Sequence, residues 1–329
     1  MPQRQLTDWR KLHGSHFEGC RVLITGGAGF IGSHLCEALW GLGASVVVID
    51  DLSGGSRENL AGFRLEFVEA SILDYPTLLK CTKGCRYVLH QAALGSVPRS
   101  VEQPRLYNDV NTTGTLNVLE AAREAKVSRV MFAASSSAYG ENPVPWVETM
   151  PTLPRSPYAA TKVAGESLFR AYSVSYGLDT ACLRYFNIFG PRQNANSAYA
   201  AVIAAFAKAL LKGERPRIFG DGEQSRDFTF VHNAVQANLL AAKRDKPIEG
   251  EVLNVGTGGR ISVNQLAEKM AMAMGRPELR PIYESERAGD IKHSFADLKR
   301  TRAVLGYEPI VGFATGLEET MAWYRTVLA

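Results

Sequence analysis

Apolar and polar positions along residues 20–184 follow two periodicities in turn. Short apolar runs, which are typical of buried strands, occupy residues 21–25, 46–49, 65–68, 87–90, 130–134 and 180–184. Apolar residues at helical spacing occupy residues 31–42, 75–81, 112–125 and 157–176. Strands that alternate with helices predict a parallel sheet with helices on both faces. The expected fold class is therefore α/β, with a doubly wound parallel sheet.

The alternation loosens after residue 184, where glycine and proline become frequent. This change predicts a smaller C-terminal region built onto the sheet. We expect residues 19–185 to form the first domain, with residues 229–257 returning to it. Residues 186–228 and 258–329 would form the second, substrate-binding domain.

Residues 1–18 form an N-terminal extension to this pattern. Leu6, Trp9 and Leu12 are spaced by three residues, as in a short amphipathic helix that packs on the body of the protein. A frayed tail is the alternative.

Composition and charge narrow the class of protein. A hydrophobic content of 46% with 21% charged residues is ordinary for a globular protein, and no apolar run approaches the ~20 residues of a membrane helix. The net charge of +4 is small and scattered, so we expect no nucleic-acid or membrane partner. Neither the cysteines nor the histidines have metal-ligand spacing, so we expect no metal and reduced thiols in a cytoplasmic protein.

A glycine-rich turn joins the first predicted strand to the first predicted helix. Gly27, Gly29 and Gly32 match G-x-G-x-x-G, and Gly26, Gly29 and Gly32 match its longer variant. Without side chains the backbone can turn tightly and approach a pyrophosphate at a helix N-terminus. An ordinary strand–helix turn is the alternative. The cofactor contacts expected here are Gly26, Gly29, Phe30, Ile31 and Gly32.

Asp50 ends the second predicted strand and completes the dinucleotide-binding pattern. Its carboxylate can accept hydrogen bonds from a ribose 2′-hydroxyl and would repel a 2′-phosphate. Asp51 follows, and no arginine stands beside it to reverse this preference. We therefore expect a Rossmann-type first domain that binds NAD rather than NADP.

A tyrosine and a lysine lie one helical turn apart at the start of the helix predicted over 157–176. Ser156 is a good N-cap and Pro157 suits the first helical position. Tyr158 and Lys162 then share one face of the helix. A nearby ammonium and the helix N-terminus favour a phenolate, which can exchange a proton with a sugar hydroxyl. The alternative is a surface Tyr/Lys pair.

These motifs resemble, in content and order, the extended short-chain dehydrogenase/reductase family over residues 20–329. The resemblance rests on the glycine fingerprint, the serine-rich residues 134–140 and Y-x-x-x-K. It implies that Ser135 hydrogen-bonds the reacting hydroxyl, beside Tyr158 and Lys162 as catalytic residues. Ser136 and Ser137 stand where sugar-nucleotide 4,6-dehydratases carry an Asp–Glu pair, so a dehydratase is not expected.

Further segments resemble the NAD-binding parts of that family. Residues 90–93 (His-Gln-Ala-Ala) resemble the segment that lines NAD after the fourth strand. Ala70-Ser71-Ile72 departs from the usual Gly-Asp-Ile, so the Ser71 hydroxyl would replace part of the aspartate's contact with adenine. The resemblance thus adds the cofactor contacts Ser71, Ile72, Gln91, Ala92, Ala93, Tyr158 and Lys162.

Three segments resemble the parts of the family that hold a nucleotide-diphosphate sugar. Asn187 would lie near the diphosphate, and Arg226 and Arg287 would bind its oxygens as guanidinium forks. A single arginine is more often a solvated surface charge, but the three segments occur together. The other expected substrate contacts are Ser96, Ser136, Ser137, Ala201, Val202, Ile218, Asp290 and Ser294.

Within the family the chain is most similar to UDP-N-acetylhexosamine 4-epimerases of polysaccharide synthesis, through residues 93–100, 198–203 and 293–297. Ser294 stands where epimerases confined to non-acetylated hexoses carry a tyrosine, and a small residue leaves room for an N-acetyl group. The implied reaction is NAD-dependent C4 epimerisation of UDP-N-acetylglucosamine (UDP-GlcNAc) to UDP-N-acetylgalactosamine (UDP-GalNAc) through a 4-keto sugar. A homodimer is implied as well.

Two alternatives stay open. The first is a UDP-uronate 4-epimerase acting on UDP-glucuronic acid or its N-acetylated counterpart, whose carboxylate could be met by Arg99 or by solvent. The second is a catalytically idle NAD-binding scaffold, which the presence of Ser135, Tyr158 and Lys162 disfavours.

Overall fold

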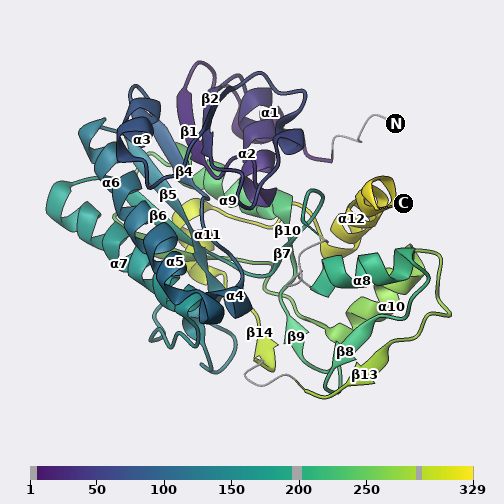
Figure 1. The fold of residues 1–329 in the computed structure, drawn as a ribbon. Coiled ribbons are helices and arrows are strands. Elements are labelled where there is room, and N and C mark those ends of the chain that lie inside the picture. Colours follow the sequence, from purple (N-terminus) through teal and green to yellow (C-terminus); the bar gives the residue numbers. More distant parts are fainter. Residues whose placement is uncertain (1–5, 195–201, 287–290, 329) are drawn as a thin grey trace.

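The computed structural model describes residues 6–194, 202–286 and 291–328, and a seven-stranded sheet lies at its centre (Figure 1). All the neighbouring strands of this sheet run parallel. In spatial order they are β3 (Glu66–Glu69), β2 (Ser45–Asp50), β1 (Arg21–Thr25), β4 (Tyr87–His90), β5 (Arg129–Ser135), β6 (Thr180–Tyr185) and β11 (Glu251–Val255). The predicted fold class is confirmed.

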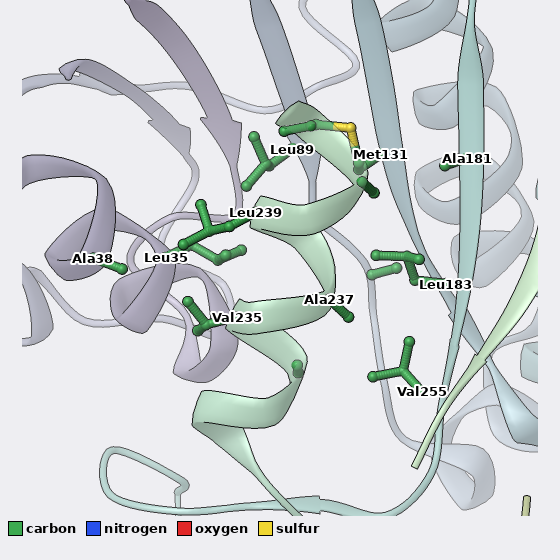
Figure 2. Close-up of a cluster of buried hydrophobic side chains, with 14 of the residues drawn as sticks. Leu35, Ala38, Leu89, Met131, Ala181, Leu183, Val235, Ala237, Leu239 and Val255 are labelled. Carbon is green, nitrogen blue, oxygen red and sulfur yellow. The ribbon is translucent and has the colours of Figure 1, made fainter. Parts of the chain in front are cut away.

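Helices cover both faces of the sheet because strand residues alternate in direction. Val22 and Ile24 belong to the cluster under α2 (Phe30–Gly41) and α9 (Val231–Lys243), whereas Leu23 belongs to the cluster on the other face. Figure 2 shows part of the first cluster, with side chains of α2 and α9 meeting those of the strands. The other face is covered by α3 (Tyr75–Thr82), α6 (Gly114–Glu124) and α7 (Pro157–Tyr176).

Short elements connect the sheet to its outer helices. The helix predicted over 112–125 begins later as a regular α-helix, because residues 109–113 form a π-helical turn. The remaining elements of this half are η1 (Arg57–Leu60), α4 (Val97–Glu102), α5 (Pro104–Asn108), η2 (Asp109–Thr113) and η3 (Ser136–Tyr139).

A smaller region lies beside the carboxyl ends of the strands, at the lower right of Figure 1. Its core joins α8 (Val202–Leu211), α10 (Val263–Ala273) and α12 (Phe313–Val327). Its short strands are β7 (Ile188–Phe189), β8 (Arg217–Phe219), β9 (Ser225–Arg226), β10 (Thr229–Phe230), β12 (Ile261–Ser262), β13 (Ile282–Glu284) and β14 (His293–Ser294). A further helix, α11 (Lys299–Leu305), contacts β11 and α9 of the main sheet.

The N-terminal extension forms α1 (Trp9–His13) and packs against the body. Its buried side chains are Trp9 and His13, whereas Leu12 is 39% exposed. His13 Nε2 lies 2.8 Å from the Gln236 side chain of α9. The spacing of Leu6, Trp9 and Leu12 therefore predicts a helix correctly. It is wrong about the buried face, which carries His13 in place of Leu12.

Candidate active site

A cavity of about 920 Å³ opens at the carboxyl ends of the strands. It lies where β1 is flanked by β2 on one side and β4 on the other, so that the strand order reverses. Crevices at such reversals are the usual ligand sites of doubly wound sheets. A second cavity of about 280 Å³ adjoins it in the smaller region and shares Asn187, Ile188, Gln193 and Arg226 with it.

The glycine turn after β1 forms one wall of the large cavity. A Cβ atom on Gly26, whose φ is +68°, would lie 2.6 Å from the backbone nitrogen of Ala92, and one on Gly32 would overlap the carbonyl oxygen of Gly26. Gly29 is the N-cap of α2, and no side chain caps this end of the helix. Its first amide groups are left for an anion, so the turn fits the diphosphate of a dinucleotide.

Asp50 lies at the end of β2 and lines the same cavity. It is 8% exposed, and its carboxylate accepts hydrogen bonds from the backbone nitrogens of Ala28 (2.9 Å) and Leu52 (2.8 Å). Burial raises the pKa of Asp50, and these two amides oppose the shift. The carboxylate therefore both braces the glycine turn and faces the ribose position expected for NAD.

We expect Asp50→Asn to weaken NAD binding by about tenfold or more, since a hydrogen bond to a charged group contributes about 1.5–3 kcal/mol. NADP binding should stay equal or improve, because the carboxylate no longer repels a 2′-phosphate. Calorimetric dissociation constants for both dinucleotides test this, with Asp245→Asn, at an exposed aspartate that lines neither cavity, as the control. Equal losses for NAD and NADP would point instead to a collapsed glycine turn.

The other expected cofactor contacts also reach the cavity. Two hydrogen bonds fix the Gln91 side chain. Tyr185 Oη donates to its Oε1 at 3.2 Å, and its Nε2 donates to Asn238 Oδ1 at 3.4 Å. Ser71 Oγ accepts a hydrogen bond from the backbone nitrogen of Leu73. The lining contains Phe30, Ile31, Ser71, Ile72, Gln91, Ala92 and Ala93.

Helix α7 carries the Tyr158/Lys162 pair into the cavity. Ser156 is its N-cap, and its hydroxyl accepts a hydrogen bond from the backbone nitrogen of Ala159 at 3.1 Å. Lys162 is buried, donates to the carbonyl oxygen of Ala133 at 2.8 Å, and lies 5.9 Å from the centre of the Tyr158 ring. Both side chains line the cavity, so the surface-pair alternative does not describe them.

The pKa of Tyr158 departs from the sequence expectation. Burial in the cavity wall raises it above its usual value, and a hydrogen bond with Ser135 opposes the shift. Burial also lowers the pKa of Lys162 to about 8. The phenolate that the sequence favoured is thus not stabilised in the protein alone, because desolvation outweighs the hydrogen bond with Ser135.

Three serines lie at the end of β5. Ser135 caps η3, and its hydroxyl oxygen lies 3.2 Å from the Ser137 backbone nitrogen and 2.8 Å from the Ser137 hydroxyl. Ser135, Ser136 and Ser137 all line the cavity near Tyr158. The positions of a dehydratase acid/base pair are therefore occupied by neutral hydroxyls.

The expected substrate residues divide among the two cavities and their surroundings. Asn187 and Arg226 line both, Ser294 lines the large one, and Val202 and Ile218 line the small one. Ser96 lines neither; it caps α4, where it accepts a hydrogen bond from the Arg99 backbone nitrogen. Ala201, Arg287 and Asp290 lie outside the described residues.

Some lining residues were missed by sequence reasoning. Trp146 and Arg155 line the large cavity, and the Arg155 guanidinium is paired with the Glu141 carboxylate. Arg99, considered earlier for a sugar carboxylate, is exposed on α4 and does not line the cavity. Arg155 could have been noticed from its position three residues before Tyr158.

Other kinds of site are not found within the described ranges. No group of three or more histidine, cysteine, aspartate or glutamate side chains there could hold a metal ion. None of the helices described is long and apolar enough to span a membrane. The five cysteines are free thiols.

Comparison with known proteins identifies relatives over nearly the whole chain. Residues 22–256 match the NAD dependent epimerase/dehydratase family. A UDP-glucose 4-epimerase of Mycolicibacterium smegmatis is 41% identical over 93% of this chain and 98% of its own length. The UDP-N-acetylglucosamine 4-epimerase of Methanobrevibacter ruminantium, solved with UDP-N-acetylmuramic acid, is 42% identical with a TM-score of 0.90, covering 94% of this chain and 99% of that one.

A third relative acts on an acidic sugar. It is a variant of the UDP-glucuronic acid 4-epimerase of Bacillus cereus, solved with NAD and UDP-4-deoxy-4-fluoro-glucuronic acid. It is 30% identical with a TM-score of 0.86, and the match covers 93% of this chain and 99% of that one.

Proposed function

Because this chain belongs to the NAD-dependent epimerase/dehydratase family, we propose that it interconverts UDP-GlcNAc and UDP-GalNAc. Its relatives make it an NAD-dependent UDP-sugar 4-epimerase, which is an isomerase. The proposal is narrower, because it selects N-acetylated hexoses among the UDP-sugars.

The observation that carries the choice of sugar is the small side chain at position 294. Ser294 lies on β14, paired with Arg226 of β9, and it lines the large cavity although only 5% of it is exposed. A hydroxymethyl group there leaves space that a larger side chain would fill. The UDP-N-acetylglucosamine 4-epimerase of M. ruminantium supports the same choice.

The residues around the cavity then take distinct roles. NAD, when bound, supplies the hydride acceptor and donor for C4 of the sugar. Tyr158 removes the proton of the C4 hydroxyl and returns it, while Ser135 hydrogen-bonds the same oxygen. Lys162, buried beneath Tyr158, stabilises the phenolate form of Tyr158, which is the form that can accept this proton. Asn187 and Arg226 hold the diphosphate where the two cavities meet.

A UDP-uronate 4-epimerase is the second candidate, and Arg155 is the observation that favours it. Its guanidinium could bind a sugar carboxylate, but the pairing with Glu141 already neutralises it. A carboxylate would have to displace Glu141, whereas a neutral sugar leaves the pair intact. Both side chains of this pair are largely exposed, so the competition adds little, and the ranking rests on Ser294.

Incubating the purified protein separately with four UDP-sugars tests this ranking. The set comprises UDP-GlcNAc, UDP-glucose, UDP-glucuronic acid and UDP-N-acetylglucosaminuronic acid, with epimers separated by chromatography. We expect the largest kcat/KM for UDP-GlcNAc. A larger value for either uronate would transfer the assignment to the second candidate, and turnover of none would favour the idle scaffold.

Ser294→Tyr should shift the preference toward UDP-glucose and UDP-galactose. An N-acetyl group would meet the added ring, and overpacking typically costs about 1–3 kcal/mol, which is roughly a 5- to 150-fold loss in kcat/KM. The non-acetylated pair should lose much less, and Ser294→Ala should leave both pairs near wild type. Equal losses for the two pairs would show that residue 294 does not select the sugar.

A homodimer, a cytoplasmic location and a role in polysaccharide synthesis stay predictions for this chain. The division into residues 19–185 with 229–257, and 186–228 with 258–329, also stays a prediction.

A further inference from the structure

Glu166 continues the line of functional side chains along α7. Tyr158, Lys162 and Glu166 follow one another at four-residue intervals, so they share one face of the helix. Lys162 is 3% exposed and Glu166 is 5% exposed. A buried carboxylate is strongly destabilising unless it is well paired, so the position of Glu166 one turn from the lysine calls for an explanation.

Arg184 fixes the orientation of the Glu166 carboxylate. Its Nε and Nη2 donate to the two carboxylate oxygens at 2.8 and 2.7 Å, in a bidentate pair that is almost fully buried. The guanidinium lies 4.4 Å from the centre of the Tyr139 ring. The bidentate pair therefore holds the Glu166 carboxylate in one orientation.

Three groups around Lys162 favour its charge: the Glu166 carboxylate, the Ala133 carbonyl oxygen that it contacts, and the face of the Phe132 ring. Its ammonium lies 4.9 Å from the centre of the Phe132 ring on β5. From β4, His90 is buried, and its pKa is lowered to about 3 by burial and by Lys162, so it is neutral. From β6, the Arg184 guanidinium is paired with the Glu166 carboxylate. Burial lowers the pKa of Lys162, and the Glu166 charge opposes that shift.

We propose that Glu166 is a positioning residue for the epimerase reaction, whose carboxylate, held by Arg184, keeps the buried ammonium of Lys162 charged beneath Tyr158. The inference rests on the proposed roles of Tyr158 and Lys162, and it does not depend on which UDP-sugar is the substrate.

From this arrangement we expect removal of Glu166 and removal of Arg184 to shift the pKa of Lys162 in opposite directions. Without the Glu166 carboxylate, nothing charged opposes the burial of Lys162, which therefore loses its proton at a lower pH. Without the Arg184 cation, the carboxylate acts on Lys162 alone, which then holds its proton to a higher pH. A purely structural ion pair would destabilise both variants and leave the pH dependence of the reaction unchanged.

The test compares Glu166→Gln, Arg184→Met and the double variant. For each, kcat is measured against pH with whichever UDP-sugar pair the wild type epimerises best. The alkaline limb should lie near pH 8 in the wild type, as the pKa of Lys162 indicates. It should move down by about one unit in Glu166→Gln and up in Arg184→Met.

A second readout is independent of turnover. The Tyr158 phenolate can be followed by ultraviolet difference titration against Tyr158→Phe in the same background, and its pKa should rise in Glu166→Gln. NAD content and thermal unfolding establish that each variant is folded. If Glu166→Gln does not fold, the double variant compared with Arg184→Met still isolates the carboxylate, and it should show the lower alkaline limb of the two.

Unchanged pH dependence, or shifts of both single variants in the same direction, would overturn the proposal. Failure of the N-acetylhexosamine assignment would appear separately, as a different preferred sugar in the wild type.

Discussion

Replacing Tyr158 with phenylalanine should lower kcat by about 10²- to 10⁴-fold, the usual contribution of a positioned acid–base group. The ring remains to pack over Lys162, and only the hydroxyl that we propose exchanges protons with the sugar is lost. The fold and the NAD content should therefore stay at wild-type levels. Steady-state epimerisation of UDP-GlcNAc, together with quantification of released dinucleotide, measures both parts of this expectation.

Tyr176→Phe provides the matched control for that experiment. Tyr176 is the last residue of the same helix and is 58% exposed, so removal of its hydroxyl should leave kcat unchanged. If the Tyr158 variant turned over at near wild-type rate, another group would have to carry the proton. The roles proposed for Lys162 and Glu166 would then fail with it.

Replacing Gly32 with alanine should weaken NAD binding by about 100-fold or more. The added Cβ would overlap the Gly26 carbonyl oxygen and lie 2.8 Å from the Cα of Gly27. Both neighbours are backbone atoms, which cannot rotate away as a side chain does, so the strain should reach the ~3 kcal/mol upper range of overpacking. Calorimetric titration with NAD checks this directly.

Gly41→Ala is the control for this change. Gly41 belongs to the same helix, and a Cβ there would meet no atom within 4 Å. The variant should bind NAD as the wild type does and melt at an equal or higher temperature. If Gly32→Ala also bound NAD normally, the glycine turn could not be the diphosphate site.

Local sequence signals predicted most of the first half of the fold. Helix α7 spans the predicted residues because Ser156 and Pro157 mark its start and Gly177, in the left-handed conformation, marks its end. Strand β11 was not predicted as a separate element, since its five residues lie between loops and carry no distinct period. The π-helical turn at 109–113 was missed for a related reason, because it keeps helical spacing while changing the hydrogen bonds.

The site residues that lie at a strand end or a helix start could be predicted from the sequence. Those on converging loops could not. Gly26, Asp50 and Tyr158 line the cavity because each follows directly from a strand end or a helix start. The arginine at the cavity wall is Arg155 and not Arg99, which we had considered. Which arginine lines the cavity depends on how loops distant in sequence come together. The direction of the Tyr158 pKa also required the structure, since sequence spacing does not reveal how much water a side chain loses.

The smaller cavity has a consequence for how this protein can change over evolutionary time. Every residue that lines it lies beyond residue 185, between Asn187 and Val263, whereas the glycine turn and Asp50 precede residue 51. Substitutions at the residues that line only the smaller cavity therefore need not disturb the glycine turn or Asp50. Under the proposed function, residues 187–263 can change the sugar nucleotide that is bound while the residues proposed to bind NAD stay constant, and chimeras between relatives can use the same separation.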